Sequence, residues 1–205
     1  MVSIGIGGNI GSGKTTVAKE LVKCYQKNDV KVKLIDADSI AWKLYKRNMF
    51  GVTRSAIYDK IIKAFGNSIL DKKNEIDRKK LGKLVFDNNK LLGKLNKIVH
   101  PDLIRRLNTE LKKTDASVKV LDAALLFFWG KKIRVSYRIL VTSSDKQKVA
   151  RMAKRGYNSK EVKTRLKQQM KESEMEKISD FIVRNDGTLN QLRKKVEFLY
   201  QILKD

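Results

Sequence analysis

The residues with the clearest chemistry form a glycine-rich segment near the N-terminus. Gly8, Gly13, Lys14 and Thr15 fit the P-loop spacing of one glycine, four further residues, and then glycine, lysine and threonine. Glycines permit a positive φ, so that successive backbone N–H groups can close around an anion. Lys14 can follow the β- and γ-phosphates during transfer, and the hydroxyl of Thr15 is the usual ligand for Mg²⁺. The segment therefore predicts a binding site for a polyphosphate.

Two carboxylates follow the second apolar run of the chain. Residues 30–35 are predicted to form a strand that leads into Asp36 and Asp38, and side chains two apart on a strand face the same way. We therefore expect both at the carboxyl ends of the strands, where open α/β folds bind ligands. One can accept a proton from an attacking hydroxyl, while the other holds position or orients metal-bound water. The alternative is that they are loop or helix N-cap residues, because residues 39–47 have a helical pattern.

A third carboxylate closes another predicted strand. Residues 118–121 lead into Asp122, which is followed by AALLFFWG. In a chain with a P-loop, a strand that ends in Asp is the Walker B arrangement, in which the carboxylate holds water on Mg²⁺ beside Thr15. We expect the aromatic residues 127–129 to belong to the core or to a wall of the acceptor pocket rather than to an interaction patch.

A basic helical pair, broken at residues 156–158, is predicted in the C-terminal third. Between Asp145 and Glu172, ten Lys or Arg residues accompany three acidic ones. Arg151, Arg155 and Arg165 are the candidates for phosphate contact, because a planar guanidinium can bind phosphoryl oxygens with two hydrogen bonds. Small kinases close such a pair over ATP and shield the transferring group from water. The alternative for each arginine is a solvated, charged helix face.

The elements that must position these residues follow from the periodicity of the chain. The strands are predicted at residues 3–6, 30–35, 118–121, 137–142 and 181–184, and a final amphipathic helix is predicted at residues 189–203. Residues 55–113 are mostly helical in pattern and too long for a simple crossover. We therefore predict an α/β P-loop NTPase fold in one domain, with a five-stranded parallel sheet, helices on both faces, a helical acceptor-binding insertion over residues 55–113 and a basic helical lid over residues 145–175.

One helical stretch of the insertion carries a proline and the only histidine. Pro101 interrupts an apolar helical stripe, so we expect the helix to kink or to restart there. From its position alone, His100 is expected to make a structural hydrogen bond rather than to act as a general base.

Length, charge and cysteine content narrow the class of protein. The 205 residues suit one domain with a full core, and no apolar run reaches membrane-spanning length. The net charge of +24 raises the question of nucleic acid, but the lysines are spread along the chain without interleaved aromatic residues. We therefore expect neither a membrane nor a nucleic-acid partner, and the oligomeric state stays open. The first predicted strand begins almost at the N-terminus and leaves no room for a signal peptide. The single cysteine, Cys24, cannot form an internal disulfide, so we expect the protein in the reducing cytoplasm.

The order of these blocks resembles the dephospho-coenzyme A kinase family over almost the full length. The resemblance rests on GGNIGSGKT, IDADSIA, FGNSIL, IDRKKLGKLVF and LNKIVHP, on the strand before ALL, and on Gln, Arg and Asn positions of the C-terminal third. LNKIVHP in particular is not a general feature of P-loop proteins. The resemblance implies that, with Mg²⁺, the γ-phosphate of ATP is transferred to the ribose 3′-hydroxyl of dephospho-CoA, the last step of coenzyme A synthesis.

The functional residues of that family carry over onto individual positions of this chain. The resemblance implies that Asp38 is the general base, and Lys14 and Arg151 complete the predicted catalytic set. Nucleotide binding is expected at Gly11, Ser12, Gly13, Lys14, Thr15, Thr16, Arg155 and Asn185. Acceptor binding is expected at Asp38, Asp77, Arg78 and His100, and metal binding at Thr15 and Asp122.

One segment departs from the family pattern, and two other functions compete with the resemblance. The family usually has a proline and a later acidic residue where this chain has Ala124 and then Phe128 or Trp129. The first alternative is another small P-loop kinase that acts on a nucleoside, a nucleotide or a shikimate-like acid. The second is a basic P-loop protein without enzyme activity that binds nucleic acid or switches with nucleotide. An Asn-Lys-x-Asp guanine signature is lacking, because NKIV at Asn96 has no Asp.

Overall fold

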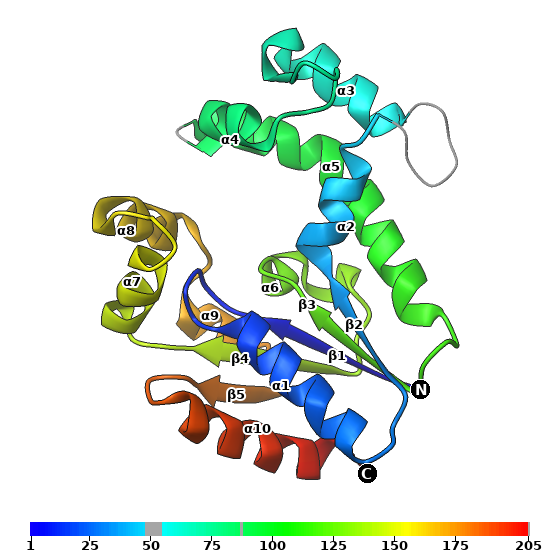
Figure 1. Cartoon of the computed structure of the whole chain (residues 1–205), viewed down its shortest axis with the longest axis vertical. Coiled ribbons are helices and arrows are strands. Elements are labelled where there is room, and N and C mark those ends of the chain that lie inside the picture. Colours follow the sequence, from blue (N-terminus) through cyan, green and yellow to red (C-terminus); the bar gives the residue numbers. More distant parts are fainter. Residues whose placement is uncertain (48–54, 87, 205) are drawn as a thin grey trace. The chain divides into compact units, whose positions relative to one another are not determined.

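The computed structural model describes residues 1–47, 55–86 and 88–204 and divides the chain into two compact units (Figure 1). The sheet unit consists of Met1–Asp36 and Glu110–Asp205, and the helical unit consists of Ala37–Thr109. None of the described helices is both long and apolar enough to span a membrane.

The sheet unit contains a five-stranded parallel sheet with the strand order β2-β3-β1-β4-β5. The strands are β1 (Val2–Gly7), β2 (Val32–Asp36), β3 (Val118–Asp122), β4 (Tyr137–Thr142) and β5 (Phe181–Arg184). The predicted α/β fold with five parallel strands is thus confirmed, although β2 begins at Val32 and β3 includes Asp122. Because every pair is parallel, all the strands end at one edge of the sheet, which we call the carboxyl edge.

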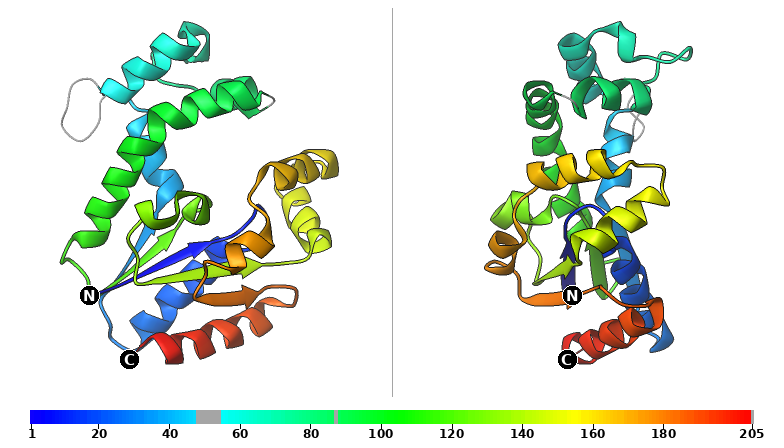
Figure 2. Two further views of the ribbon diagram at one scale, coloured as in Figure 1. Left: turned by 180° about the vertical axis from the view of Figure 1, so that it is seen from behind. Right: turned by 90° about the vertical axis from the view of Figure 1, so that its left-hand side faces the viewer.

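Helices cover both faces of this sheet (Figure 2). On one face, α1 (Lys14–Lys27) and α10 (Leu189–Leu203) share a buried core with alternate strand residues. These strand residues are Ile4, Ile6, Val118, Val120, Ile139, Val141 and Val183. On the other face, α6 (Leu126–Trp129) packs so closely that a Cβ on Gly5 would lie 2.8 Å from Cδ2 of Leu126. Burial on both faces is typical of parallel sheets and accounts for the apolar strands.

Short helices form the basic segment that the sequence predicts as a lid. η2 (Gly130–Lys132) follows α6, and the basic segment after β4 consists of α7 (Asp145–Ala153), α8 (Ser159–Gln168) and α9 (Glu172–Glu176). The predicted break between the basic helices is confirmed, and the chain passes it with a φ of 86° at Gly156. α8 then begins with a capping box between Asn158 and Glu161, in which each side chain accepts the backbone N–H of the other.

The helical unit contains several buried apolar residues. Its elements are α2 (Ala37–Leu44), α3 (Ala56–Phe65), η1 (Asn67–Ile69), α4 (Arg78–Phe86) and most of α5 (Asn89–Lys112). Ile61, Leu81 and Leu107 are almost completely buried. The unit begins at Ala37, directly after β2, whereas the insertion is predicted from residue 55. α5 continues through Pro101, so the helix does not restart there.

Tyr25 links the helix that follows the P-loop to the C-terminal helix. Its ring lies edge to face against Tyr200, with the ring centroids 4.9 Å apart, and its hydroxyl donates to the backbone oxygen of Leu203 over 3.3 Å. Only 2% of Tyr25 is exposed. Burial is the main reason that the pKa of this phenol is raised to about 12.

We predict that Tyr25 makes the protein less stable in alkali. In the unfolded chain a tyrosine titrates at about pH 10. The stability that the neutral phenol contributes is therefore complete below about pH 10 and is lost as the pH rises toward about 12. Over this range the free energy of unfolding should fall by up to about 1.4 kcal/mol per pH unit for this group.

The measurement is a series of urea titrations from about pH 9 to about pH 12. The decrease should be shallower for Tyr25→Phe than for the wild type. Tyr137→Phe, at a ring that is 37% exposed, is the control and should follow the wild type. An equally steep decrease in Tyr25→Phe would contradict the prediction.

Candidate active site

The predicted P-loop connects β1 to α1 and has the backbone conformation of an anion site. Gly8, Gly11 and Gly13 have φ values of 149°, 75° and 97°, which residues with a side chain rarely adopt. α1 begins after Gly13, and within the described part of the chain no side chain caps its first turn. The start of α1, with its unpaired N–H groups and positive dipole end, is therefore available for a phosphate.

Side chains from the C-terminal third bind the carbonyl groups of this loop. Nη1 of Arg151 donates to the backbone oxygens of Gly11 and Ser12 over 3.1 Å and 3.2 Å. Nδ2 of Asn185 also donates to the oxygen of Ser12, over 2.8 Å. When N–H groups turn inward around an anion, the carbonyls turn outward and need donors of their own. Arg151 and Asn185 supply these donors and hold the loop from its outer side.

The packing of the loop explains why glycine is required at two positions. A Cβ on Gly13 would lie 2.2 Å from Nδ2 of Asn185, and a Cβ on Gly11 would lie 2.7 Å from the backbone oxygen of Lys148. Asn185 and Lys148 are both buried, so neither atom can move aside easily. Space and positive φ thus exclude side chains at residues 11 and 13.

Arg151 also binds two groups outside the P-loop. Besides the loop carbonyls, it donates to Oγ of Ser143 over 3.1 Å and to the backbone oxygen of Asn185 over 2.7 Å. Burial lowers the pKa of its guanidinium, and the nearby Asp186 opposes this effect. These contacts give Arg151 a positioning role for the P-loop, while its catalytic role stays a prediction.

The other residues of the C-terminal third that are predicted to bind nucleotide differ from one another in exposure and in their contacts. Arg155 is exposed just after α7. The guanidinium of Arg165 lies 4.7 Å from the centre of the Tyr157 ring, a cation–π contact inside the predicted lid segment. Asn185 is buried and reaches the P-loop, and its predicted contact with adenine stays a prediction.

Two carboxylates end neighbouring strands at the carboxyl edge. Asp36 and Asp122 are partners in the register of β2 and β3, and Asp122 is also the partner of Ile6 in β1. Asp36 is exposed, whereas Asp122 is only 8% exposed. Since β1 leads into the P-loop, the predicted metal ligands Thr15 and Asp122 follow adjacent strands of the sheet. Their hydroxyl and carboxylate oxygens are hard donors of the kind that Mg²⁺ prefers.

The prediction that Asp38 extends a strand with Asp36 is wrong. β2 ends at Asp36 and α2 begins at Ala37, so that Asp38 lies in the first turn of a helix. The alternation of side chains along a strand therefore does not apply to this pair. At a helix N-terminus a carboxylate is stabilised by the helix dipole, and Asp38 is exposed there.

Asp38 and Arg78 come together around two aromatic residues of the helical unit. The pKa of the Tyr45 phenol is raised to about 12 by burial and then by the charge of Asp38, and Arg78 opposes this effect. The guanidinium of Arg78 lies 3.9 Å from the centre of the Trp42 ring, and the Trp42 and Tyr45 rings meet edge to face at 4.7 Å. The cation–π contact holds the predicted acceptor arginine near the predicted base.

Two further predicted acceptor residues have structural positions in the helical unit. Oδ1 of Asp77 accepts the N–H groups of Lys79 and Lys80 over 2.8 Å and 3.2 Å, so Asp77 caps α4. These backbone hydrogen bonds lower the pKa of Asp77. His100 is half-buried on α5. Acceptor binding by Asp77 and His100 stays a prediction.

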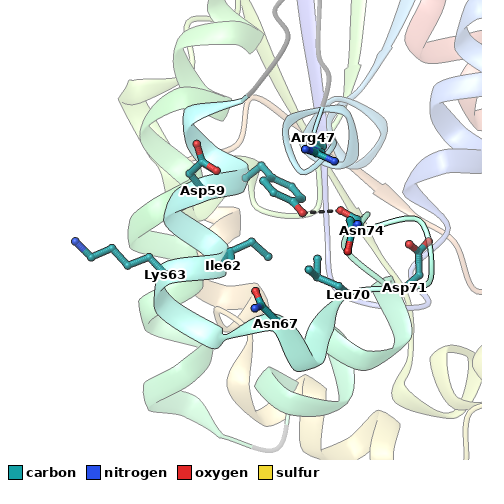
Figure 3. A pocket seen from close by; sticks show the side chains of 9 residues that line it. Arg47, Asp59, Ile62, Lys63, Asn67, Leu70, Asp71 and Asn74 are labelled. Atoms are coloured by element: carbon teal, nitrogen blue, oxygen red, sulfur yellow. Dashed lines mark hydrogen bonds between the residues drawn. The ribbon is translucent and has the colours of Figure 1, made fainter.

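A cavity of about 720 Å³ opens in the helical unit beside α3 and η1 (Figure 3). Its lining mixes amide, charged and apolar side chains, namely Arg47, Tyr58, Asp59, Ile62, Lys63, Asn67, Leu70, Asp71 and Asn74. The hydroxyl of Tyr58 donates to the backbone oxygen of Asn74 over 2.5 Å, as drawn in Figure 3. This mixture of groups suits a flexible, polar ligand better than an apolar one.

The segment with the departures from the family pattern consists of a turn at Ala124 and Leu125 followed by α6. Phe127 and Trp129 are 3% and 5% exposed, so the expectation that they belong to the core is confirmed. Phe128 is 67% exposed and therefore does not belong to the core, while its place in a wall of the acceptor pocket stays a prediction.

The sequence reasoning missed several residues that shape the site. Trp42 and Tyr45 follow Asp38 by four and seven residues, which is the spacing of one helix face, so a helix starting at Ala37 would have placed all three together. Gln169 was missed as well. Its Oε1 accepts the backbone N–H of Ile10 in the P-loop over 2.9 Å, and no local pattern links residues so far apart in the chain.

Comparison with known proteins gives one consistent family. A family model described as dephospho-CoA kinase matches residues 2–191. The chain is 36% identical to the dephospho-CoA kinase of Fusobacterium nucleatum over 196 residues, which cover 95% of this chain and 94% of that protein. It is 30% identical to the dephospho-CoA kinase of Aquifex aeolicus over 204 residues, or 99% of this chain and 98% of that protein.

Solved structures share the fold of this chain. The crystal structure of TT1252 from Thermus thermophilus has a TM-score of 0.74 at 30% identity, covering 98% of this chain and 97% of that one. The dephospho-CoA kinase from Campylobacter jejuni has a TM-score of 0.64 at 23% identity, covering 97% and 95%, and so supports the fold alone.

We predict that Gly13→Ala loses nucleotide binding. The added Cβ would meet Nδ2 of Asn185 at 2.2 Å and force a φ of 97° on alanine, so the loop must open. The affinity for ADP with Mg²⁺, measured by titration calorimetry, should fall by at least about 100-fold, as expected when a strained loop loses several hydrogen bonds.

Gly93→Ala is the matched control. Among the described residues nothing lies within 4 Å of a Cβ at Gly93, which is inside α5. The affinity for ADP should therefore stay unchanged, and the stability should rise by roughly 0.5–1 kcal/mol because alanine favours a helix. Equal ADP binding by both variants would disprove the steric argument.

Proposed function

The chain belongs to the dephospho-CoA kinase family, and we propose that it transfers the γ-phosphate of ATP to the ribose 3′-hydroxyl of dephospho-CoA with Asp38 as the general base. The observation that carries the proposal is the P-loop whose carbonyls are bound by Arg151 and Asn185. It supplies the phosphate site of an ATP-dependent kinase, in a chain that matches the family from residue 2 to residue 191.

ATP is the phosphate donor in this proposal. The amides of residues 11–16 and the dipole of α1 hold the β- and γ-phosphates. Lys14 carries the full positive charge that follows the transferring group. Because Arg151 and Asn185 bind the loop carbonyls, these contacts reduce the binding energy needed to order the loop.

The chain offers a donor set that fits Mg²⁺. We assign the hydroxyl of Thr15 as a direct ligand and the carboxylate of Asp122 as the group that holds water on the ion, since both follow adjacent strands at the carboxyl edge. When bound, Mg²⁺ neutralises charge on the phosphate oxygens. Asp36, the register partner of Asp122, is the next carboxylate at this edge.

The acceptor is bound by the helical unit in this proposal. Asp38 accepts the proton of the 3′-hydroxyl as that oxygen attacks, and its exposure leaves the carboxylate open to the substrate. Arg78, held against Trp42, pairs with a phosphate of the acceptor. Asp77 and His100 complete the proposed acceptor site.

The basic helices over residues 145–175 act as the lid. Exclusion of water by the lid favours transfer to the acceptor over hydrolysis of ATP. Arg151 and Arg155 are the proposed lid arginines, with Arg151 acting on the loop through the contacts described above. The use of ATP and the single cysteine, Cys24, support a cytoplasmic location.

The test is conversion of dephospho-CoA to CoA in the presence of ATP and Mg²⁺, followed by chromatography. Adenosine, AMP and shikimate serve as competing acceptors. We expect turnover with dephospho-CoA alone among these, and none for Lys14→Ala, which lacks the charge on the transferring phosphate. A preference for AMP or another nucleoside monophosphate would contradict the proposed substrate.

A second prediction concerns the base. Asp38→Asn should lower kcat by a factor of roughly 10² to 10⁴, because an amide cannot accept the hydroxyl proton. The affinity for ADP should stay close to that of the wild type, because the P-loop is unchanged. Asp29→Asn is the control, since Asp29 has a φ of 57°, a conformation that asparagine also adopts readily. Turnover near the wild-type rate in Asp38→Asn would remove this residue from the mechanism.

A further inference from the structure

The P-loop has one amide that is turned toward a side chain instead of toward its anion site. The N–H of Ile10 donates to Oε1 of Gln169 over 2.9 Å in a partly buried contact. Ile10 lies between Gly8 and Gly11, the glycines that shape the loop. The bond therefore fixes the middle of the loop, where neither Arg151 nor Asn185 has a described contact.

Gln169 is itself placed by the end of a lid helix. Its own N–H donates to the backbone oxygens of Arg165 and Leu166 over 3.2 Å and 3.3 Å, as the C-terminal cap of α8. α9 begins three residues later, at Glu172. The side chain that binds the N–H of Ile10 thus belongs to residues 169–171, the junction between α8 and α9, which we call the lid junction.

An ion pair with a buried lysine connects this junction to α7. Nζ of Lys148 lies 2.6 Å from Oε1 of Glu172 and 3.1 Å from Oδ1 of Asp145, and the side chain of Lys148 is only 4% exposed. An ammonium group at this depth must keep its carboxylate partners, because an unpaired buried charge is very costly. The backbone of Lys148 also packs on Gly11, where an added Cβ would lie 2.7 Å from its oxygen.

We propose that Gln169 is a positioning residue that couples the lid junction to the P-loop through Ile10. The ion pair of Lys148 and Glu172 holds the lid junction in place, and the hydrogen bond of Gln169 links the junction to the backbone of Ile10. A displacement of the junction must either break the bond to Ile10 or carry the middle of the loop with it. Nucleotide affinity therefore depends on a side chain that does not contact the phosphates. The inference rests on the proposed function only in taking the loop to bind ATP.

The experiment compares two changes at Gln169. Gln169→Met keeps the length of the side chain but lacks the carbonyl acceptor, and Gln169→Glu keeps an acceptor for the Ile10 N–H. Gln26→Met, at an exposed position near the end of α1, is the matched control. Binding of ADP with Mg²⁺ is measured by calorimetry at low and at high ionic strength, because salt weakens the effect of the extra charge of the glutamate and leaves the hydrogen bond in place. Melting temperatures are recorded in parallel.

We expect Gln169→Met to bind ADP about tenfold more weakly and to have a KM for ATP raised to a similar degree, as for the loss of one acceptor from a partly buried N–H. The KM for dephospho-CoA should stay within about twofold of the wild type, because the acceptor site does not use this bond. Gln169→Glu should recover most of the ADP affinity. Gln26→Met should match the wild type.

Wild-type ADP affinity in Gln169→Met would overturn the proposal. Equal losses in Gln169→Met and Gln169→Glu would also overturn it, and so would a rise of both KM values together with a lower melting temperature, which indicates general destabilisation. Because ADP binding is measured without any acceptor, a wrong acceptor assignment would leave these results unaffected.

A double-mutant cycle tests the coupling to the junction. Glu172→Gln removes one charge from the partner of Lys148 and should weaken ADP binding in the same direction as Gln169→Met. If the junction acts through Gln169, the double variant should bind ADP no more weakly than Gln169→Met alone. Additive losses would show that the ion pair does not act through Gln169.

Discussion

The P-loop depends on a simple constraint of the peptide backbone. A ring of N–H groups that faces an anion leaves carbonyl groups on its outer side, and buried carbonyls need donors. In this chain the donors are the guanidinium of Arg151 and the amide of Asn185. A loop near the N-terminus is therefore shaped by residues that the chain reaches only in its last third.

The parts of the fold that could be predicted are those with local causes. The glycine spacing of the P-loop, the apolar strands and the amphipathic α10 each follow from neighbouring residues, and the structure contains all of them. The break at Gly156 was predictable for the same reason, because glycine takes the required positive φ.

Other features depend on contacts that no local pattern reveals. Asp38 was misplaced because the sequence does not show whether β2 continues or α2 begins after Asp36, and the answer lies in tertiary packing. Acceptor binding by Asp77 was predicted from a family motif. Its described hydrogen bonds instead cap α4, which is a common role of aspartate. The bond from Ile10 to Gln169 joins distant parts of the chain, so only the folded structure reveals it.

The contact between Tyr25 and the end of α10 has a consequence for synthesis of the protein. The helix that carries Lys14 is buried against a helix made of the last residues, with Tyr25 bonded to the oxygen of Leu203. On the ribosome, the nucleotide loop is made before Arg151, Asn185 and α10, so its outer donors and this support become available only later in synthesis. The nucleotide site is thus completed late, when α10 can pack on α1.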